Sequence, residues 1–196
     1  MKNLLSKYYF RAMSYFGMNI NEIEDYNMKI LYATYQLKNI EIGTIKGLKD
    51  IHMMLFSGIS DFAGRYRVHE VSFYNSYMNK KHNAVGLELL DETLRTIGKM
   101  PENSFEDIVL KYLKLIEAHP FTDGNRRAGG IWVNLMLKRL NGKMIDWRNI
   151  DKNEFYERME LFNEKKSLEP MCDFLMNYLS AEYEKEIIKE AFTHSN

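Results

Sequence analysis

The spacing of apolar residues constrains the fold of this chain more than any other feature of its sequence. Apolar side chains recur mostly at intervals of three and four residues, a period that places them on one face of an α-helix. Only 3 prolines interrupt the 196 residues, so few positions forbid a helical backbone. The sequence therefore predicts an all-α domain.

Seven segments carry this helical pattern. We expect helices at about residues 43–58, 84–97, 104–119, 125–141, 153–162, 168–179 and 183–192. Ser104 with Asp107 three residues later is typical of a capping box, which predicts the start of the third helix. Asn141-Gly142 is expected to end the fourth helix, because glycine commonly follows a helix C-terminus.

One segment, Arg67 to Tyr77, favours β-structure instead. Its β-branched and aromatic residues surround Asn75-Ser76, a pair suited to a short hairpin turn. We therefore expect one small β-hairpin beside the helices.

Charge, cysteine content and hydropathy exclude several classes of function. The 27 basic and 27 acidic residues cancel, which argues against a nucleic-acid partner bound mainly through its phosphates. The single cysteine, Cys172, excludes an internal disulfide framework and a zinc site of several thiolates. No apolar run is long enough to span a bilayer, and the first residues lack the pattern of a signal peptide. We therefore expect a cytoplasmic protein without a membrane or nucleic-acid partner, and export to a host or neighbouring cell stays open as an alternative.

The chemically richest segment lies between the third and fourth expected helices, from His119 to Arg127. Pro120 disfavours helical backbone at His119, so the third helix should end there. His119 titrates near neutrality and is suited to accepting a proton. His52, His69, His82 and His194 show no metal-ligand spacing, and we assign them no chemistry.

The same segment is suited to binding a phosphate group. A helix N-terminus presents free N–H groups to an anion, Gly124 allows a close approach, and Arg127 can bind phosphate oxygens in pairs. Asp123 is suited either to Mg²⁺ or to capping the next helix.

These residues resemble the signature of Fic-domain proteins, H-x-F-x-(D/E)-G-N-x-R-x-x-R. Six of its seven fixed positions match, at His119, Phe121, Asp123, Gly124, Asn125 and Arg127. Residues 43–65 are similar to the upstream helix of the family, and residues 132–147 to the part that follows the signature. The resemblance implies a Fic-type helical bundle with a small β-hairpin flap. It also implies a catalytic domain at 41–196, with its core at about 43–147, after an N-terminal helical extension at 1–40.

The resemblance further implies a protein adenylyltransferase, which transfers AMP from ATP to a Ser, Thr or Tyr hydroxyl of a target protein. By this resemblance His119 deprotonates the hydroxyl, and Asp123 binds Mg²⁺. The expected nucleotide-binding residues are Gly124, Asn125, Arg126 and Arg127.

The predicted hairpin occupies the place of the family's flap, which binds an extended target segment by strand addition. The expected flap residues are Val71, Ser72, Phe73, Tyr74 and Asn75. The resemblance thus predicts a target protein as a partner, and an antitoxin-like or inhibitory protein as a second one.

Two features depart from the Fic pattern. Gly130 stands where the signature has its final arginine, and together with the basic Arg126 it resembles the Doc branch, whose members phosphorylate a protein target. The family's C-terminal inhibitory motif has no match near Ser195-Asn196, which predicts lost autoinhibition or a shortened chain. A Doc-like protein kinase and a catalytically degenerate Fic-like binding module therefore stay open as alternatives.

Overall fold

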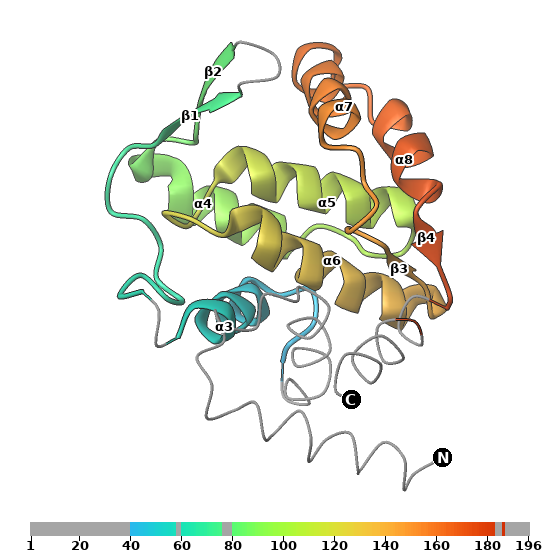
Figure 1. Ribbon diagram of the computed structural model, residues 1–196. Helices are drawn as coiled ribbons and strands as arrows, with labels where there is room; N and C mark the ends of the chain where they lie inside the picture. Colours follow the sequence, from blue (N-terminus) through green and yellow to red (C-terminus); the bar gives the residue numbers. More distant parts are fainter. Residues whose placement is uncertain (1–39, 58–59, 76–79, 183–185, 187–196) are drawn as a thin grey trace, which may run out of the picture.

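The computed structural model describes residues 40–57, 60–75, 80–182 and 186 (Figure 1). The predicted extension at 1–40 and the predicted helix at 183–192 lie outside these residues, apart from residues 40 and 186. The domain boundaries at 1–40 and 41–196 therefore stay a prediction.

Helices dominate the described part of the chain, as the apolar spacing predicts. They are α3 (Ile45–Phe56), α4 (Leu87–Gly98), α5 (Phe105–Ala118), α6 (Asn125–Asn141), α7 (Lys152–Lys165) and α8 (Glu169–Met176). The strands are β1 (Ser72–Asn75), β2 (Lys80–Asn83), β3 (Met144–Ile145) and β4 (Leu179–Ser180). The prediction of an all-α domain with a small β-hairpin is confirmed.

The core of the domain forms around α6, which crosses the centre of the molecule between α5 and α3 (Figure 1). All residues from Ala128 to Leu137 are buried, so this helix has no broad solvent face. Trp132 is completely buried and donates a hydrogen bond of 3.1 Å from its indole N–H to the Thr44 carbonyl oxygen. The packed α5–α6 pair carries the loop that holds the candidate site.

Local capping explains where these helices begin and end. The Ser104 hydroxyl accepts a hydrogen bond of 3.0 Å from the Asp107 N–H, which confirms the predicted start of α5. Asp151 caps α7 in the same way through the Glu154 N–H, at 2.9 Å. At the end of α6, Gly142 adopts φ +74° and its N–H closes the last turn on the Lys138 carbonyl.

The β-hairpin differs in position from the prediction. β1 and β2 are antiparallel, and Asn75 pairs with Lys80, so the connection falls at residues 76–79. A turn at Asn75-Ser76 is therefore wrong, because Asn75 is still a strand residue. The second strand is the polar segment Lys80–Asn83, which lacks the apolar alternation that strand prediction depends on.

A second small sheet was not predicted. β3 pairs antiparallel with β4, and α8 ends at Met176 instead of continuing to residue 179. The Asn134 side chain of α6 supports β3, because it accepts from the Ile145 N–H at 2.9 Å and donates to the Ile145 carbonyl at 3.0 Å. This pairing explains a polar residue within the otherwise apolar buried stretch of α6 from Ala128 to Leu137. Among the described residues, no helix combines the length and apolarity that crossing a membrane requires.

Candidate active site

The loop between α5 and α6 begins at His119, the residue predicted to act as a base. α5 ends at Ala118, and His119 adopts left-handed backbone angles of φ 47° and ψ 59°. Its N–H still closes the last helical turn on the Leu115 carbonyl at 3.1 Å. The following Pro120 disfavours right-handed helical angles at His119, so the chain must leave the helix axis there, as predicted.

The side chain of Asn125 closes this loop on itself. Its Oδ1 accepts from the Phe121 N–H at 2.9 Å, and its Nδ2 donates to the Phe121 carbonyl at 2.8 Å. Phe121 is completely buried and Asn125 is 4% exposed, so the pair anchors the middle of the loop in the core. Asn125 therefore faces inward with its side chain, and only its backbone N–H is left for a ligand.

Arg67 fixes the start of the loop from outside the predicted site. Its Nε donates to the His119 carbonyl at 2.8 Å, and its backbone N–H donates to the Pro120 carbonyl at 2.9 Å. The same guanidinium donates to the His69 carbonyl at 3.0 Å and to the Val85 carbonyl. Arg67 thus joins the segment before the hairpin, the segment after it and the backbone of His119.

The imidazole of His52 fixes the end of the loop. His52 is completely buried on α3, and its Nε2 lies 2.9 Å from the Asp123 carbonyl oxygen. Sequence reasoning assigned no chemistry to His52 and did not single out Arg67. A histidine within the apolar stripe of Leu48, Ile51 and Leu55 was the one available indication.

Asp123 and Arg127 face outward together at the N-terminus of α6. Asp123 Oδ2 accepts from the Arg127 guanidinium at 2.8 Å, and the two side chains are 63% and 45% exposed. Asp123 Oδ1 accepts from the Gly124 N–H at 2.5 Å. Burial by itself raises the pKa of Asp123, but the hydrogen bonds from Gly124 and Arg127 outweigh it and lower the pKa. The carboxylate is therefore ionised at neutral pH.

His119 has the protonation state that a general base needs. Burial, followed by the nearby charge of Arg67, lowers the pKa of His119 below its ordinary value of 6.5, and Asp123 opposes this only in part. The ring is therefore mostly neutral at pH 7 and can accept a proton.

Both the backbone conformation at position 124 and the packing around it require a glycine. It caps α6 with φ +79°, a conformation that favours glycine, and a Cβ there would lie 2.3 Å from the Phe56 ring. No side chain of the described residues caps α6, so its first N–H groups suit an anion. Asp123 precedes the cap position instead of filling it.

Arg126 points away from Arg127 and toward α7. Its guanidinium donates to the Tyr156 hydroxyl at 2.8 Å and lies 4.7 Å from the centre of the Phe155 ring. In this structure the Arg126 guanidinium contacts aromatic residues. Phosphate binding by Arg126 stays a prediction. Gly130 is buried one turn further along α6.

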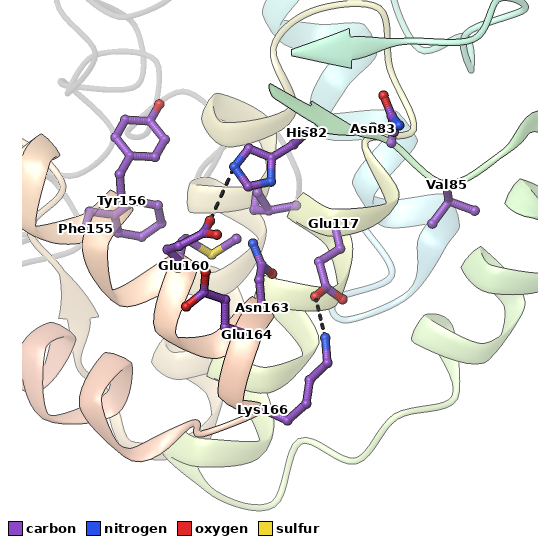
Figure 2. Close-up of a pocket in the computed structure, with 13 residues that line it drawn as sticks. His82, Asn83, Val85, Glu117, Phe155, Tyr156, Glu160, Asn163, Glu164 and Lys166 are labelled. Carbon is purple, nitrogen blue, oxygen red and sulfur yellow. Dashed lines mark ion pairs between the residues drawn. The ribbon is translucent and has the colours of Figure 1, made fainter. Parts of the chain in front are cut away.

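A pocket of about 460 Å³ opens beside this loop, between β2, the end of α5 and α7 (Figure 2). Its apolar lining includes Ala84, Val85, Ile116, Phe155 and Met159. Two ion pairs lie at its edge, His82 with Glu160 at 3.3 Å and Lys166 with Glu117 at 3.7 Å. Oδ1 of Asn163 is buried in its wall and has no hydrogen-bond partner among the described residues. The pocket combines residues from three distant segments, and no sequence pattern predicted it.

The expected flap residues begin with Val71 and continue through β1. The Val71 carbonyl accepts from the Ala84 N–H at 3.0 Å, and the Ser72 hydroxyl donates to Asn83 Oδ1 at 2.8 Å. Within the described residues the sheet has two strands, so β1 has one edge without a partner strand. Target binding by Val71 to Asn75 stays a prediction.

Comparison with known proteins agrees with this architecture. Residues 43–137 match the profile of the Fic/DOC family. The chain is also 30% identical to "Protein adenylyltransferase Fic" of Nematostella vectensis over 149 residues, which are 71% of this chain and 33% of that protein. The chain therefore spans about a third of the length of this curated relative.

Solved structures share the fold. An N-terminal Fic domain of a Bep effector from Bartonella quintana with bound ADP has a TM-score of 0.63 at 16% identity, covering 89% of this chain and 86% of its own. BepC of Bartonella tribocorum with bound AMPPNP has a TM-score of 0.60 at 16% identity, covering 89% and 87%. The chain belongs to the Fic/DOC family, with its family domain at residues 43–137.

Proposed function

We propose that this protein transfers AMP from ATP to a hydroxyl group of a protein side chain. The observation that carries the proposal is the position of the pocket next to the loop. Ile116 and Glu117 of the pocket lie in the last turn of α5, three and two residues before His119, and Tyr156 of the pocket holds Arg126 at the start of α6. A nucleotide whose purine ring lies in the pocket would therefore have its phosphates near the N-terminus of α6.

The pocket has the size and chemistry of a nucleoside site. Its volume of about 460 Å³ falls in the range of small-molecule sites, and its apolar walls suit the faces of a purine. The size and the apolar lining of the pocket support a purine nucleotide such as ATP as the donor.

Phosphate binding is assigned to the first turn of α6. The free N–H groups of a helix N-terminus and the Arg127 guanidinium offer positive potential and hydrogen-bond donors to the phosphates. The Asp123 carboxylate is ionised and exposed, and Mg²⁺ commonly binds one or two carboxylates together with substrate phosphates. These residues fit Mg²⁺, which would supply charge neutralisation at the phosphates.

His119 provides the proton acceptor for the reaction. The neutral ring takes the proton of the target hydroxyl as its oxygen bonds to the α-phosphorus. The bond from that phosphorus to the bridging oxygen breaks, and pyrophosphate leaves. The target segment would lie along the open edge of β1, held by backbone hydrogen bonds.

A Doc-like kinase is the second candidate, and the observation that favours it is Gly130. Without an arginine at this position, α6 offers one guanidinium fewer for the terminal phosphate, which leaves the nucleotide orientation less constrained. In the kinase reading the γ-phosphate faces the target hydroxyl.

Labelled ATP separates the candidates. The purified protein is incubated with Mg²⁺ and either α-labelled or γ-labelled ATP, with its own chain and a cell lysate as acceptors. AMP transfer puts only the α-label on protein, whereas phosphorylation puts only the γ-label there. His119→Ala should abolish the label and leave ATP affinity nearly unchanged, because the base acts on the hydroxyl and not on the nucleotide. A wild-type protein that binds ATP and transfers neither label would favour the binding module.

A further inference from the structure

The peptide unit between Asp123 and Gly124 is held by two groups on opposite sides. Its carbonyl oxygen lies 2.9 Å from Nε2 of the buried His52. Its N–H donates to the Asp123 carboxylate, on the exposed side of the loop, at 2.5 Å. In a trans peptide the C=O and N–H bonds point in opposite directions, and the described residues include no cis peptide. Anchoring the carbonyl inward therefore directs the Gly124 N–H outward.

The hydrogen bonds of His52 define its tautomer. The Gly64 N–H can only donate, and it lies 2.9 Å from Nδ1, so Nδ1 carries the lone pair. The neutral ring therefore carries its proton on Nε2 and donates it to the Asp123 carbonyl, which can only accept. Both ring nitrogens are satisfied, and the donor faces the loop.

Packing holds the His52 ring in this position. It stacks on Phe121, with ring centres 3.7 Å apart and planes inclined by 15°, and the Phe56 ring centre lies 4.6 Å away. Phe121 is the residue that Asn125 ties into the loop. The imidazole thus contacts the loop through its face and through its edge.

Gly124 needs such an anchor because glycine adopts positive and negative φ with similar ease. A flip of the Asp123–Gly124 peptide would turn the N–H inward and the carbonyl oxygen outward, toward the phosphates. An oxygen there would repel an anion, whereas an N–H binds it. A backbone site that can flip must therefore be set by another group.

We propose that His52 is a positioning residue that sets the Asp123–Gly124 peptide and so turns the Gly124 N–H outward. There this N–H donates to the Asp123 carboxylate, and a phosphate of a bound nucleotide would replace the carboxylate as its acceptor. The anion in this inference rests on the proposed function. The orientation of the peptide does not, because both hydrogen bonds exist without a ligand.

Two substitutions separate the hydrogen bonds of the imidazole. His52→Gln extends an amide nitrogen to the place of Nε2 and keeps the donor to Asp123. His52→Asn places an amide oxygen near Nδ1, so it keeps the acceptor for Gly64 and loses the donor to Asp123. Ile51→Val, on the same helix, is the control for altered packing, because it leaves both hydrogen bonds in place.

The test measures Mg²⁺·ADP affinity by calorimetry and the amide ¹H–¹⁵N signal of Gly124 by NMR. We expect His52→Asn to weaken ADP binding about tenfold, the loss of roughly one hydrogen bond, and to shift or broaden the Gly124 signal. His52→Gln and Ile51→Val should stay within about threefold of the wild type, with a near-native Gly124 signal.

Two other outcomes of these measurements would contradict the role of His52 or the proposed function. Equal ADP affinity in the asparagine and glutamine variants, with the same Gly124 signal in both, would overturn the role of His52. A wild-type protein that does not bind Mg²⁺·ADP would overturn the proposed function, and the Gly124 signal alone would then decide whether His52 sets the peptide.

Discussion

The backbone carbonyl oxygen of His119 accepts a hydrogen bond of 2.8 Å from Nε of Arg67, a side chain that is only 4% exposed. The same guanidinium reaches the Val85 carbonyl beyond the hairpin, and the Glu70 carboxylate lies 3.8 Å from it. One buried cation therefore fixes the backbone of His119 and contributes to the lowered pKa of its imidazole.

Replacing Arg67 should destabilise the fold more than its position in a connecting segment suggests. Arg67→Met removes a buried guanidinium that donates to the carbonyl groups of His119, His69 and Val85, and we expect a loss of about 3 kcal/mol in the free energy of unfolding. Urea denaturation measures it. Arg65→Met, at an exposed position two residues earlier, is the matched control and should change stability by less than about 0.5 kcal/mol. Equal losses in the two variants would contradict the anchoring role of Arg67.

The pH dependence of transfer follows from the lowered pKa of His119. A base works in its neutral form, so the rate should hold at pH 7 and fall as the pH falls through the folded pKa, which lies below 6.5. The measurement is kcat/KM for label transfer from about pH 5 to pH 8. An acid limb centred above 6.5 would show that burial and Arg67 do not control the base.

The proposed metal role of Asp123 predicts that its replacement weakens nucleotide binding only when Mg²⁺ is present. Asp123→Asn keeps an acceptor for the Gly124 N–H and removes the charge. We expect ADP binding in Mg²⁺ to weaken about tenfold, and binding in EDTA to stay equal or tighten, since one carboxylate no longer repels the phosphates. Calorimetry under both conditions measures this, with the exposed Asp173→Asn on α8 as the control. An equal loss under both conditions would instead indicate a structural role.

Gly130 provides the sharpest test of the family comparison. An arginine there follows Arg127 by three residues on α6 and would project toward the same phosphates. Gly130→Arg should tighten ATP binding by about 1.5–3 kcal/mol, the range for a charged hydrogen bond, and affect ADP less. Gly130→Ala separates this gain from the effect of filling a buried glycine position. In the kinase reading the nucleotide is inverted, so ATP binding and transfer should not improve. Unchanged ATP affinity would show that position 130 does not face the nucleotide.

The sequence predicted the parts of the fold that depend on neighbouring residues. Ser104 and Asp107 marked the start of α5, and His119-Pro120 marked its end, because capping and the restriction before proline act within one turn. The hairpin turn was predicted at the wrong residues because β2 is polar. Its strand conformation depends on its pairing with β1, which an apolar pattern does not reveal. α8 ended early because β4 pairs with β3, which follows α6 much earlier in the chain.

The sequence by itself determined the helical class and the order of reactive groups from His119 to Arg127, because both are properties of one continuous segment. Tertiary structure decided how those groups are held. His52 reaches Asp123 across 71 residues, and Arg67 reaches His119 across 52. The pocket with Asn163 likewise needs β2, α5 and α7 together. Hydrogen bonds and cavities between distant segments depend on how the helices pack. The local periodicity of a sequence does not predict that packing.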